Sequence, residues 1–216
     1  LRMDRDTTSK KNGHEKILKA FGAHQADILL GTQMIAKGLD YPEVTLVGII
    51  NGDEGLSRTD YRSCEITFDL LMQAAGRSGR SNEPGEVVFQ VFDPDHYAVQ
   101  CAAKQDYDTF FAHEMQFRHA GQYPPYTYLI SLTVTDVNQA KVDETALYLK
   151  QNLVKETFKT IGVVQLLKIK DRFRSRIILK GRNLDEMRAA VNELFERDGY
   201  EKFKNVRIDV NPMTLD

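Results

Sequence analysis

The sequence predicts an open α/β sheet followed by a smaller α+β domain. In the first half, short apolar runs alternate with segments whose apolar residues recur at helical spacing, as in parallel strands joined by right-handed crossovers. In the second half the patterns run strand, helix, strand, strand, helix, strand, which is typical of a ferredoxin-like or related sandwich. The consecutive prolines Pro124 and Pro125 cannot continue a helix. We therefore place the domains at 1–122 and 123–216.

Composition limits the function classes. The chain has 216 residues, with 29 Lys and Arg against 31 Asp and Glu, so nucleic-acid binding requires local patches instead of an overall positive field. The two cysteines, Cys64 and Cys101, lack metal-ligand spacing, which favours a reducing compartment, and we expect the cytoplasm. The apolar runs are strand-sized, so neither a signal peptide nor a membrane partner is expected.

The elements of the first domain follow from these patterns. The chain opens at Leu1 without methionine and inside a strand-like segment, so we expect a piece of a longer protein. Polar residues at 6–9 offer helix N-caps. Two runs are too short for helices and are predicted to be buried parallel strands. In order, we expect a helix around 17–21, the two buried strands at 26–30 and 45–50, a helix at 62–75, a strand at 86–92 and a helix at 95–120.

The second domain is expected to contain four strands and two helices. The strands fall at 127–135, 163–169, 175–180 and 205–210, and the helices fall at 139–158 and 184–197.

The octapeptide Gln73–Arg80 indicates an anion site. Arg77 and Arg80 each follow a glycine directly, after an apolar helix pattern. A glycine inside a helix costs roughly 1 kcal/mol relative to alanine, so the pattern favours close approach to a ligand. Arginine presents a planar fork of donors that matches phosphate oxygens. The alternative is an ordinary helix C-terminus, with a glycine cap and arginines that complement the helix dipole.

A second stretch, residues 31–42, has the features of a phosphate-binding turn. The strand before it delivers Gly31 and Thr32 to the ligand edge of the sheet, where a hydroxyl and free backbone N–H groups can hold a phosphate. Gly38 allows close backbone approach, and the Asp40 carboxylate suits a sugar hydroxyl. An ordinary strand-to-helix turn with a capping threonine explains the same residues.

These stretches resemble a known family. Gly31–Gly38 with Asp40–Pro42, and Gln73–Arg80, are similar to motifs V and VI of superfamily 2 helicases. The residues of both motifs are most similar to those of the primosomal replication-restart helicases. The junction Pro124-Pro125-Tyr126 also resembles that family. The resemblance implies a RecA-like second helicase lobe with a partial parallel sheet, followed by the small α+β domain.

The resemblance implies an ATP-dependent 3′–5′ DNA helicase that recognises and remodels stalled replication forks for restart. ATP and Mg²⁺ are its cofactors. Transferred onto this sequence, the catalytic residues in contact with nucleotide phosphates are Arg77, Arg80 and Gln73. The residues that sense the nucleotide are Gly38 and Asp40, and those near the DNA backbone are Thr32, Gln33 and Lys37.

Half of the motor is absent from the sequence. No Gly-x-x-x-x-Gly-Lys-Ser/Thr segment occurs, so there is no phosphate cradle. Asp53-Glu54 resembles the magnesium-binding Asp-Glu pair of an ATPase. Because the chain lacks the lysine of the phosphate-binding segment, we interpret the pair as a loop of the second lobe. The resemblance places the family's zinc module upstream of Leu1. We predict that the chain alone hydrolyses no ATP.

A basic stripe distinguishes the second domain. Its cations are Lys168, Lys170, Arg172, Arg174 and Arg176, at alternate positions. In an extended hairpin, a side-chain period of two places them on one face and Ile169, Phe173 and Ile177 on the other. The stripe predicts phosphate tracking on fork DNA, with Phe173 and Tyr126 as stacking candidates. A merely solvated face is the alternative.

The resemblance also implies protein partners. They are the acidic tail of single-stranded-DNA-binding protein and other primosome proteins, beside branched and single-stranded DNA. A basic pocket suits an acidic peptide, and the 184–197 helix with Arg188 is one possible wall. The choice between DNA and peptide stays open. Two other functions compete: a non-hydrolytic binding module with a motor-lobe fold, and another branched-DNA translocase of the superfamily, such as a branch-migration helicase.

Overall fold

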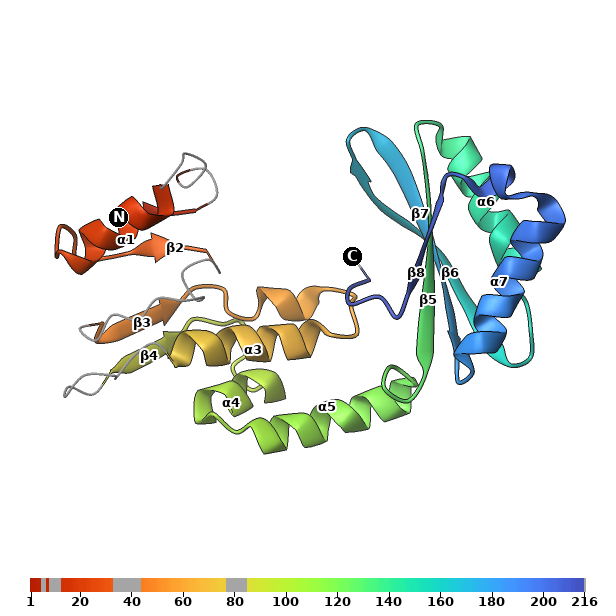
Figure 1. Ribbon diagram of the computed structural model, residues 1–216. Helices are drawn as coiled ribbons and strands as arrows, with labels where there is room; N and C mark the ends of the chain where they lie inside the picture. The colour runs from red at the N-terminus through yellow and green to blue at the C-terminus, as the bar shows by residue number, and fades with distance from the viewer. Residues whose placement is uncertain (5–6, 8–12, 33–43, 77–84, 216) are drawn as a thin grey trace. The chain divides into compact units, whose positions relative to one another are not determined.

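The computed structural model describes residues 1–4, 7, 13–32, 44–76 and 85–215 (Figure 1). It contains two compact units. Unit 1 comprises Leu1–Arg58 and Arg62–Glu114, and unit 2 comprises Thr59–Tyr61 and Met115–Asp216. The division falls inside helix α5 (Tyr107–Gly121).

The strands of unit 1 form two parallel pairs. They are β1 (Arg2–Met3) with β2 (Leu30–Gly31), and β3 (Leu46–Ile49) with β4 (Glu86–Phe89). The predicted parallel direction is confirmed, but the predicted burial is wrong, because Leu30 is 57% and Leu46 59% exposed. Within the described residues each of these sheets has only two strands, so no further strand covers them. Side chains of β3 alternate between exposed and half-buried, and Leu46 is on the exposed side.

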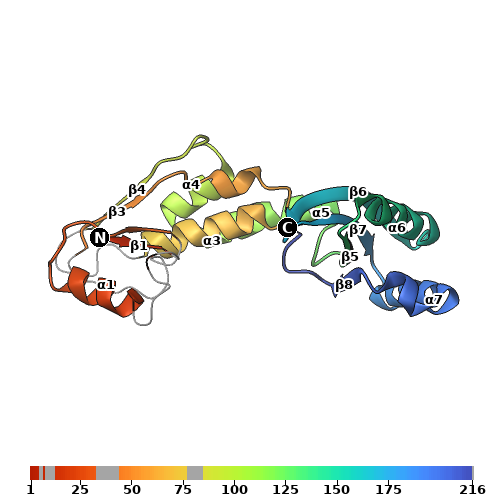
Figure 2. The ribbon, with the colours of Figure 1, turned by 90° about the horizontal axis from the view of Figure 1, so that it is seen from above.

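Helices build the core of unit 1. They are α1 (Gly13–Gly22), the short 3-10 helix η1 (Glu54–Ser57), α3 (Ser63–Ala75), α4 (Tyr97–Lys104) and α5. Helices α3 and α4 lie side by side, as Figures 1 and 2 show. The rings of Phe68 and Phe110 stack with centroids 3.9 Å apart in this core.

The helix expected at 95–120 is two helices. Gln105 adopts a left-handed conformation with φ of 54°, which ends α4. Asp106 then accepts a hydrogen bond from the Thr109 N–H at 3.0 Å, which satisfies a free donor in the first turn of α5. A polar cap and one left-handed residue therefore divide a segment whose apolar pattern is continuous.

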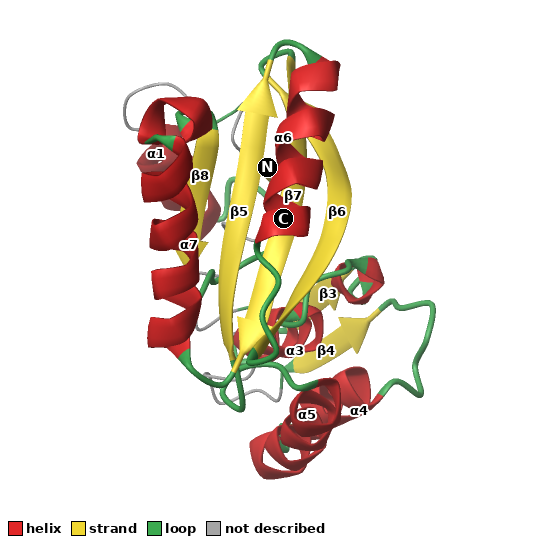
Figure 3. Cartoon of the chain, turned by 90° about the vertical axis from the view of Figure 1, so that its right-hand side faces the viewer, coloured by secondary structure: helices red, strands yellow, loops and turns green. Residues whose placement is uncertain are grey.

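Unit 2 has the predicted strand and helix order. Its elements are β5 (Tyr128–Asp136), α6 (Gln139–Asn152), β6 (Phe158–Ile169), β7 (Arg172–Gly181), α7 (Leu184–Asp198), η2 (Tyr200–Phe203) and β8 (Val206–Val210). The antiparallel sheet runs β6-β7-β5-β8, which is the ferredoxin-like order. Helices α6 and α7 cover the same face of it (Figures 1 and 3).

The core of unit 2 lies between that face and the two helices. Leu132 and Ile177 from the sheet are fully buried against Ala146 of α6 and Met187 of α7. The helix expected at 139–158 ends at Asn152, and β6 starts five residues earlier than expected. The reason is tertiary, because Phe158 is buried and pairs with Gly181 of β7.

None of the helices in the described part of the chain combines the length and the apolar character that crossing a membrane requires.

Candidate nucleotide and nucleic-acid sites

Gln73 is positioned by the end of α3. Phe68 and Leu71 bury one side of this helix, and Gln73 in its last turn is exposed. The next glycine, Gly76, has φ of −69°, and its N–H donates to the Met72 carbonyl at 3.0 Å. Any residue adopts this φ, and a Cβ added there would lie 3.5 Å from its nearest atom. Gly76 therefore caps the end of α3 without a left-handed conformation, and neither its φ nor its packing requires glycine.

Thr32 directly follows β2 and is exposed. The other residues assigned to this edge lie outside the described residues. They are Gln33, Lys37, Gly38, Asp40, Arg77 and Arg80.

Asp53 connects two loops of unit 1. Its Oδ2 accepts hydrogen bonds from the backbone N–H groups of Phe92 and Asp93, both at 2.8 Å. The bond from Asp93 lowers the pKa of the Asp53 carboxyl the most, burial opposes it, and the bond from Phe92 adds to it. This geometry gives the Asp53 carboxylate a structural role at the turn before η1, whose first residue is Glu54. Within the described residues, no group of three or more His, Cys, Asp and Glu side chains could hold a metal ion.

The predicted five-cation face needs a correction. Arg172, Arg174 and Arg176 do alternate on one face of β7, opposite Ile177 in the core. Lys168, however, lies with its Nζ 3.8 Å from the ring centroid of Phe173, which packs against that core. A β-bulge between Leu166 and Ile169 adds a residue to β6 and shifts the parity of Lys168. Lys170 belongs to the turn itself.

The arginine face, formed by Arg172, Arg174 and Arg176, is buried progressively along β7. Arg172 is exposed, Arg174 is half-buried, and Arg176 is only 7% exposed. Arg174 lies opposite Thr135 of β5. Arg172 and Arg174 are therefore the cations of this face that a ligand can reach, whereas Arg176 belongs to the folded structure.

The two stacking candidates differ. Phe173 is half-buried and the Lys168 ammonium lies over its ring, which leaves less of the ring open to a base. Tyr126 is 38% exposed, and its ring meets His119 edge-to-face with centroids 4.8 Å apart. Arg188 is half-exposed on α7, with Asp185 3.8 Å away.

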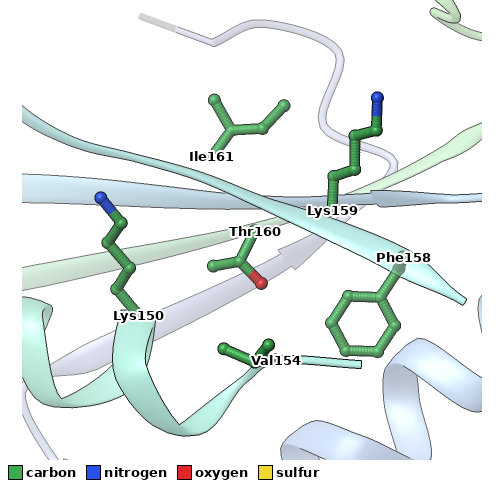
Figure 4. A pocket seen from close by; sticks show the side chains of 6 residues that line it. All are labelled: Lys150, Val154, Phe158, Lys159, Thr160 and Ile161. Carbon is green, nitrogen blue, oxygen red and sulfur yellow. The ribbon is translucent and has the colours of Figure 1, made fainter. Parts of the chain in front are cut away.

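A surface hollow that the sequence did not reveal lies where α6 ends beside β6. Its lining residues are Lys150, Val154, Phe158, Lys159, Thr160 and Ile161 (Figure 4). Figure 4 shows Lys159 and Ile161 on one side of β6, with Phe158 and Thr160 on the other. Two lysines from different elements border this hollow, whose lining is otherwise mostly apolar. Because a single helix was expected over 139–158, sequence analysis could not bring Lys150 and Lys159 together.

Comparison with known proteins matches the two parts of the chain to two family models. Residues 2–82 match the family model of the helicase conserved C-terminal domain, and residues 119–213 match that of the primosomal protein N C-terminal domain. The fold and these matches define the class: a helicase C-terminal lobe joined to an accessory domain of the primosomal type.

The particular family follows from individual relatives named replication restart protein PriA. The chain is 44% identical to that of Bacillus subtilis (strain 168) over 224 residues, covering 100% of this chain and 28% of the relative. It is 37% identical to that of Chlamydia pneumoniae, covering 99% and 29%. For Synechocystis sp. (strain ATCC 27184 / PCC 6803 / Kazusa) the identity is 38%, covering 83% and 22%. The chain belongs to the PriA family and spans less than a third of the length of these relatives.

Proposed function

We propose that this chain forms part of an ATP-dependent 3′–5′ DNA helicase that recognises and remodels stalled replication forks for replication restart. One observation carries the proposal. A single chain joins a helicase C-terminal domain, ending in the two-arginine octapeptide, to a primosomal C-terminal domain with an arginine face on its sheet. A motor lobe and a DNA-binding surface together are what a fork-remodelling enzyme requires.

The octapeptide is proposed as one wall of the nucleotide site. Bound ATP would supply the hydrolysable phosphoanhydride, and Mg²⁺ would neutralise charge on its phosphate oxygens. Arg77 and Arg80 would hold its phosphate oxygens, while Gly38 and Asp40 sense the nucleotide. The exposed Gln73 amide at the end of α3 fits a positioning role. An arginine finger accelerates phosphoryl transfer by about 10³- to 10⁵-fold.

Reconstituted hydrolysis tests this wall. We expect no ATPase activity from the chain alone, and DNA-stimulated activity after mixing with the first motor lobe of the Bacillus subtilis relative. Arg80→Ala should reduce the restored rate by about 10³-fold or more, because alanine cannot stabilise the charge on the transferring phosphoryl group. The control is Arg58→Ala, an arginine outside the octapeptide.

Sustained DNA-stimulated turnover by the chain alone would contradict the proposal, and a full rate for Arg80→Ala would show that Arg80 has no catalytic role. Failure of the lobes to restore hydrolysis would favour a non-hydrolytic binding module.

The arginine face is proposed to hold the phosphate backbone of branched or single-stranded DNA. Thr32, Gln33 and Lys37 of the motor lobe are separately proposed to lie near a DNA backbone. Arg172 and Arg174 carry the accessible charge. Protein contacts with phosphates release counterions, so affinity falls as salt rises.

The salt dependence of binding measures these contacts. For Arg172→Ala with Arg174→Ala, we expect the plot of log affinity against log salt to flatten by roughly 0.7 to 0.9 for each phosphate that is no longer neutralised. The matched control, Lys104→Ala with Lys141→Ala, removes the same charge from exposed helix positions and should leave the slope unchanged. If the two double variants have the same slope, Arg172 and Arg174 do not contact DNA phosphates.

We also propose an acidic peptide partner. The hollow between Lys150 and Lys159 suits a carboxylate-rich segment, such as the acidic tail of single-stranded-DNA-binding protein or a segment of another primosome protein. Arg188 on α7 is a second candidate contact. A fluorescent acidic peptide should bind the parent chain and lose affinity for Lys150→Gln with Lys159→Gln, whereas equal binding would exclude the hollow.

A further inference from the structure

The end of the β6–β7 hairpin is built as a projecting tip. Lys170 and Asp171 form a two-residue turn with φ of 51° and 58°, both left-handed, as a type I′ turn requires. Ile169 and Arg172 are the closing pair. Figure 1 shows this end of the hairpin bending away from the side of the sheet that carries α6 and α7. The turn therefore lies away from the core of its unit.

Aliphatic side chains occupy the centre of this tip. Leu167 is 88% exposed, more than any other large apolar side chain in the described residues, and Ile169 is 54% exposed. The bulge removes Leu167 from the regular pairing of β6 with β7. Its neighbour Lys168 lies over the Phe173 ring at 3.8 Å, which fixes the bulged segment. Exposed aliphatic surface held on a fixed turn indicates an apolar binding partner.

Cations surround these aliphatic groups. Lys168, Lys170 and Arg172 are all exposed, against one acidic residue of the turn, Asp171. An apolar centre with a cationic border matches the end of a nucleic-acid duplex, where a flat, apolar base pair lies between two phosphate chains. Leucine and isoleucine are among the apolar residues that proteins insert at base steps to unstack them.

We propose that Leu167 and Ile169 form an apolar wedge that packs on the last base pair of a DNA duplex, where it opens into single strands. Lys168, Lys170 and Arg172 then hold the phosphates of the diverging strands. The inference rests on the proposed DNA binding by this chain and specifies the DNA feature that is recognised. The wedge and Arg174 have different roles. Arg174 contacts phosphates along the DNA, whereas the wedge contacts bases and acts only at a duplex end.

The test uses a forked DNA carrying 2-aminopurine at the base pair next to the junction, and a single strand of the same length. The parent chain should raise the 2-aminopurine fluorescence as the base unstacks. Leu167→Ser with Ile169→Ser should abolish this rise and weaken fork binding about tenfold, since the variant buries less apolar surface on the base pair. Binding to the single strand should not change.

Control variants separate the wedge from general effects. Leu147→Ser changes a half-exposed leucine on α6 and should affect neither signal nor affinity. Lys170→Gln with Arg172→Gln should weaken binding to both DNAs and flatten the salt plot. Because the tip lies outside the core, circular dichroism and urea unfolding should match the parent for every variant.

Two kinds of failure are distinguishable. If the parent binds both DNAs but the serine variant binds the fork equally well, or weakens fork and single strand alike, the wedge is overturned and DNA binding stands. A parent that binds the fork without raising the fluorescence also overturns the wedge. If the parent binds neither DNA, the proposed DNA-binding function fails and the wedge fails with it.

Discussion

Single residues of one type have different roles in this chain. Asp53 is buried and accepts two backbone hydrogen bonds, whereas Asp171 is exposed in a hairpin turn. Arg172 and Arg176, four residues apart on one strand face, are exposed and buried respectively. Residue type and spacing predicted that these arginines share a face. The depth at which each lies depends on the strands beside it.

Asp53 should make stability depend on pH. Its folded-state pKa is lowered, mainly by the hydrogen bond from Asp93. A depressed carboxyl pKa stabilises the fold above the unfolded value of about 3.9, and the stabilisation is lost as pH falls through the folded value. In Asp53→Asn, unfolding free energies from urea titrations should be lower than in the parent at pH 6 and should fall less between pH 6 and pH 3. Glu54→Gln is the control, and an identical fall in Asp53→Asn and the parent would contradict the assignment.

Element boundaries were predicted where local chemistry sets them. Helix α7 starts where a polar cap precedes the helical pattern, and Asn183 Oδ1 accepts the N–H groups of Asp185 at 3.1 Å and Glu186 at 3.2 Å. The start of β6 was placed too late, because helical spacing continues beyond Asn152 while the burial of Phe158 against the opposite helices is not a local property. The start of α7 depends on neighbouring residues, whereas the start of β6 depends on packing against distant ones.

The Asn183 cap has a measurable contribution. Asn183→Ala leaves two backbone donors of α7 without their acceptor and should lower the unfolding free energy by about 1 kcal/mol in urea titrations. Asn192→Ala makes the same change at an exposed position inside the same helix, where alanine has the higher helix propensity, so stability should rise by a few tenths of a kcal/mol. A decrease of equal size in both variants would contradict a capping role.

At the scale of the whole molecule, distant segments are joined in one unit. Unit 2 includes Thr59–Tyr61, which lie more than fifty residues before the rest of it. Asp60 Oδ2 accepts hydrogen bonds from the Leu215 backbone N–H and the Thr214 hydroxyl, and the Tyr61 hydroxyl donates to the Pro212 carbonyl at 3.3 Å. Spacing and periodicity contain no signal for a pairing over this separation.

Asp60 should therefore hold the last residues in place. Asp60→Ala removes a buried charged acceptor and should cost about 1.5 to 3 kcal/mol, with faster hydrogen exchange at the Leu215 amide. Asp209→Ala, which removes a partly exposed carboxylate paired with Arg207 at 3.6 Å, should cost only about 0 to 1 kcal/mol. Unchanged exchange at Leu215 in Asp60→Ala would show that other contacts hold the terminal segment.

The sequence by itself determined the alternation of strands and helices, the ferredoxin-like order of unit 2, and the motifs that resemble a helicase lobe. These features are local, because side-chain period, caps and turn residues act within a few positions of the chain. Only the tertiary structure decided that Lys168 leaves the arginine face, that Arg176 is buried, and that Lys150 and Lys159 border one hollow. Bulges, burial and surface hollows depend on strand register and on neighbours remote in sequence, and these are fixed only when the chain packs.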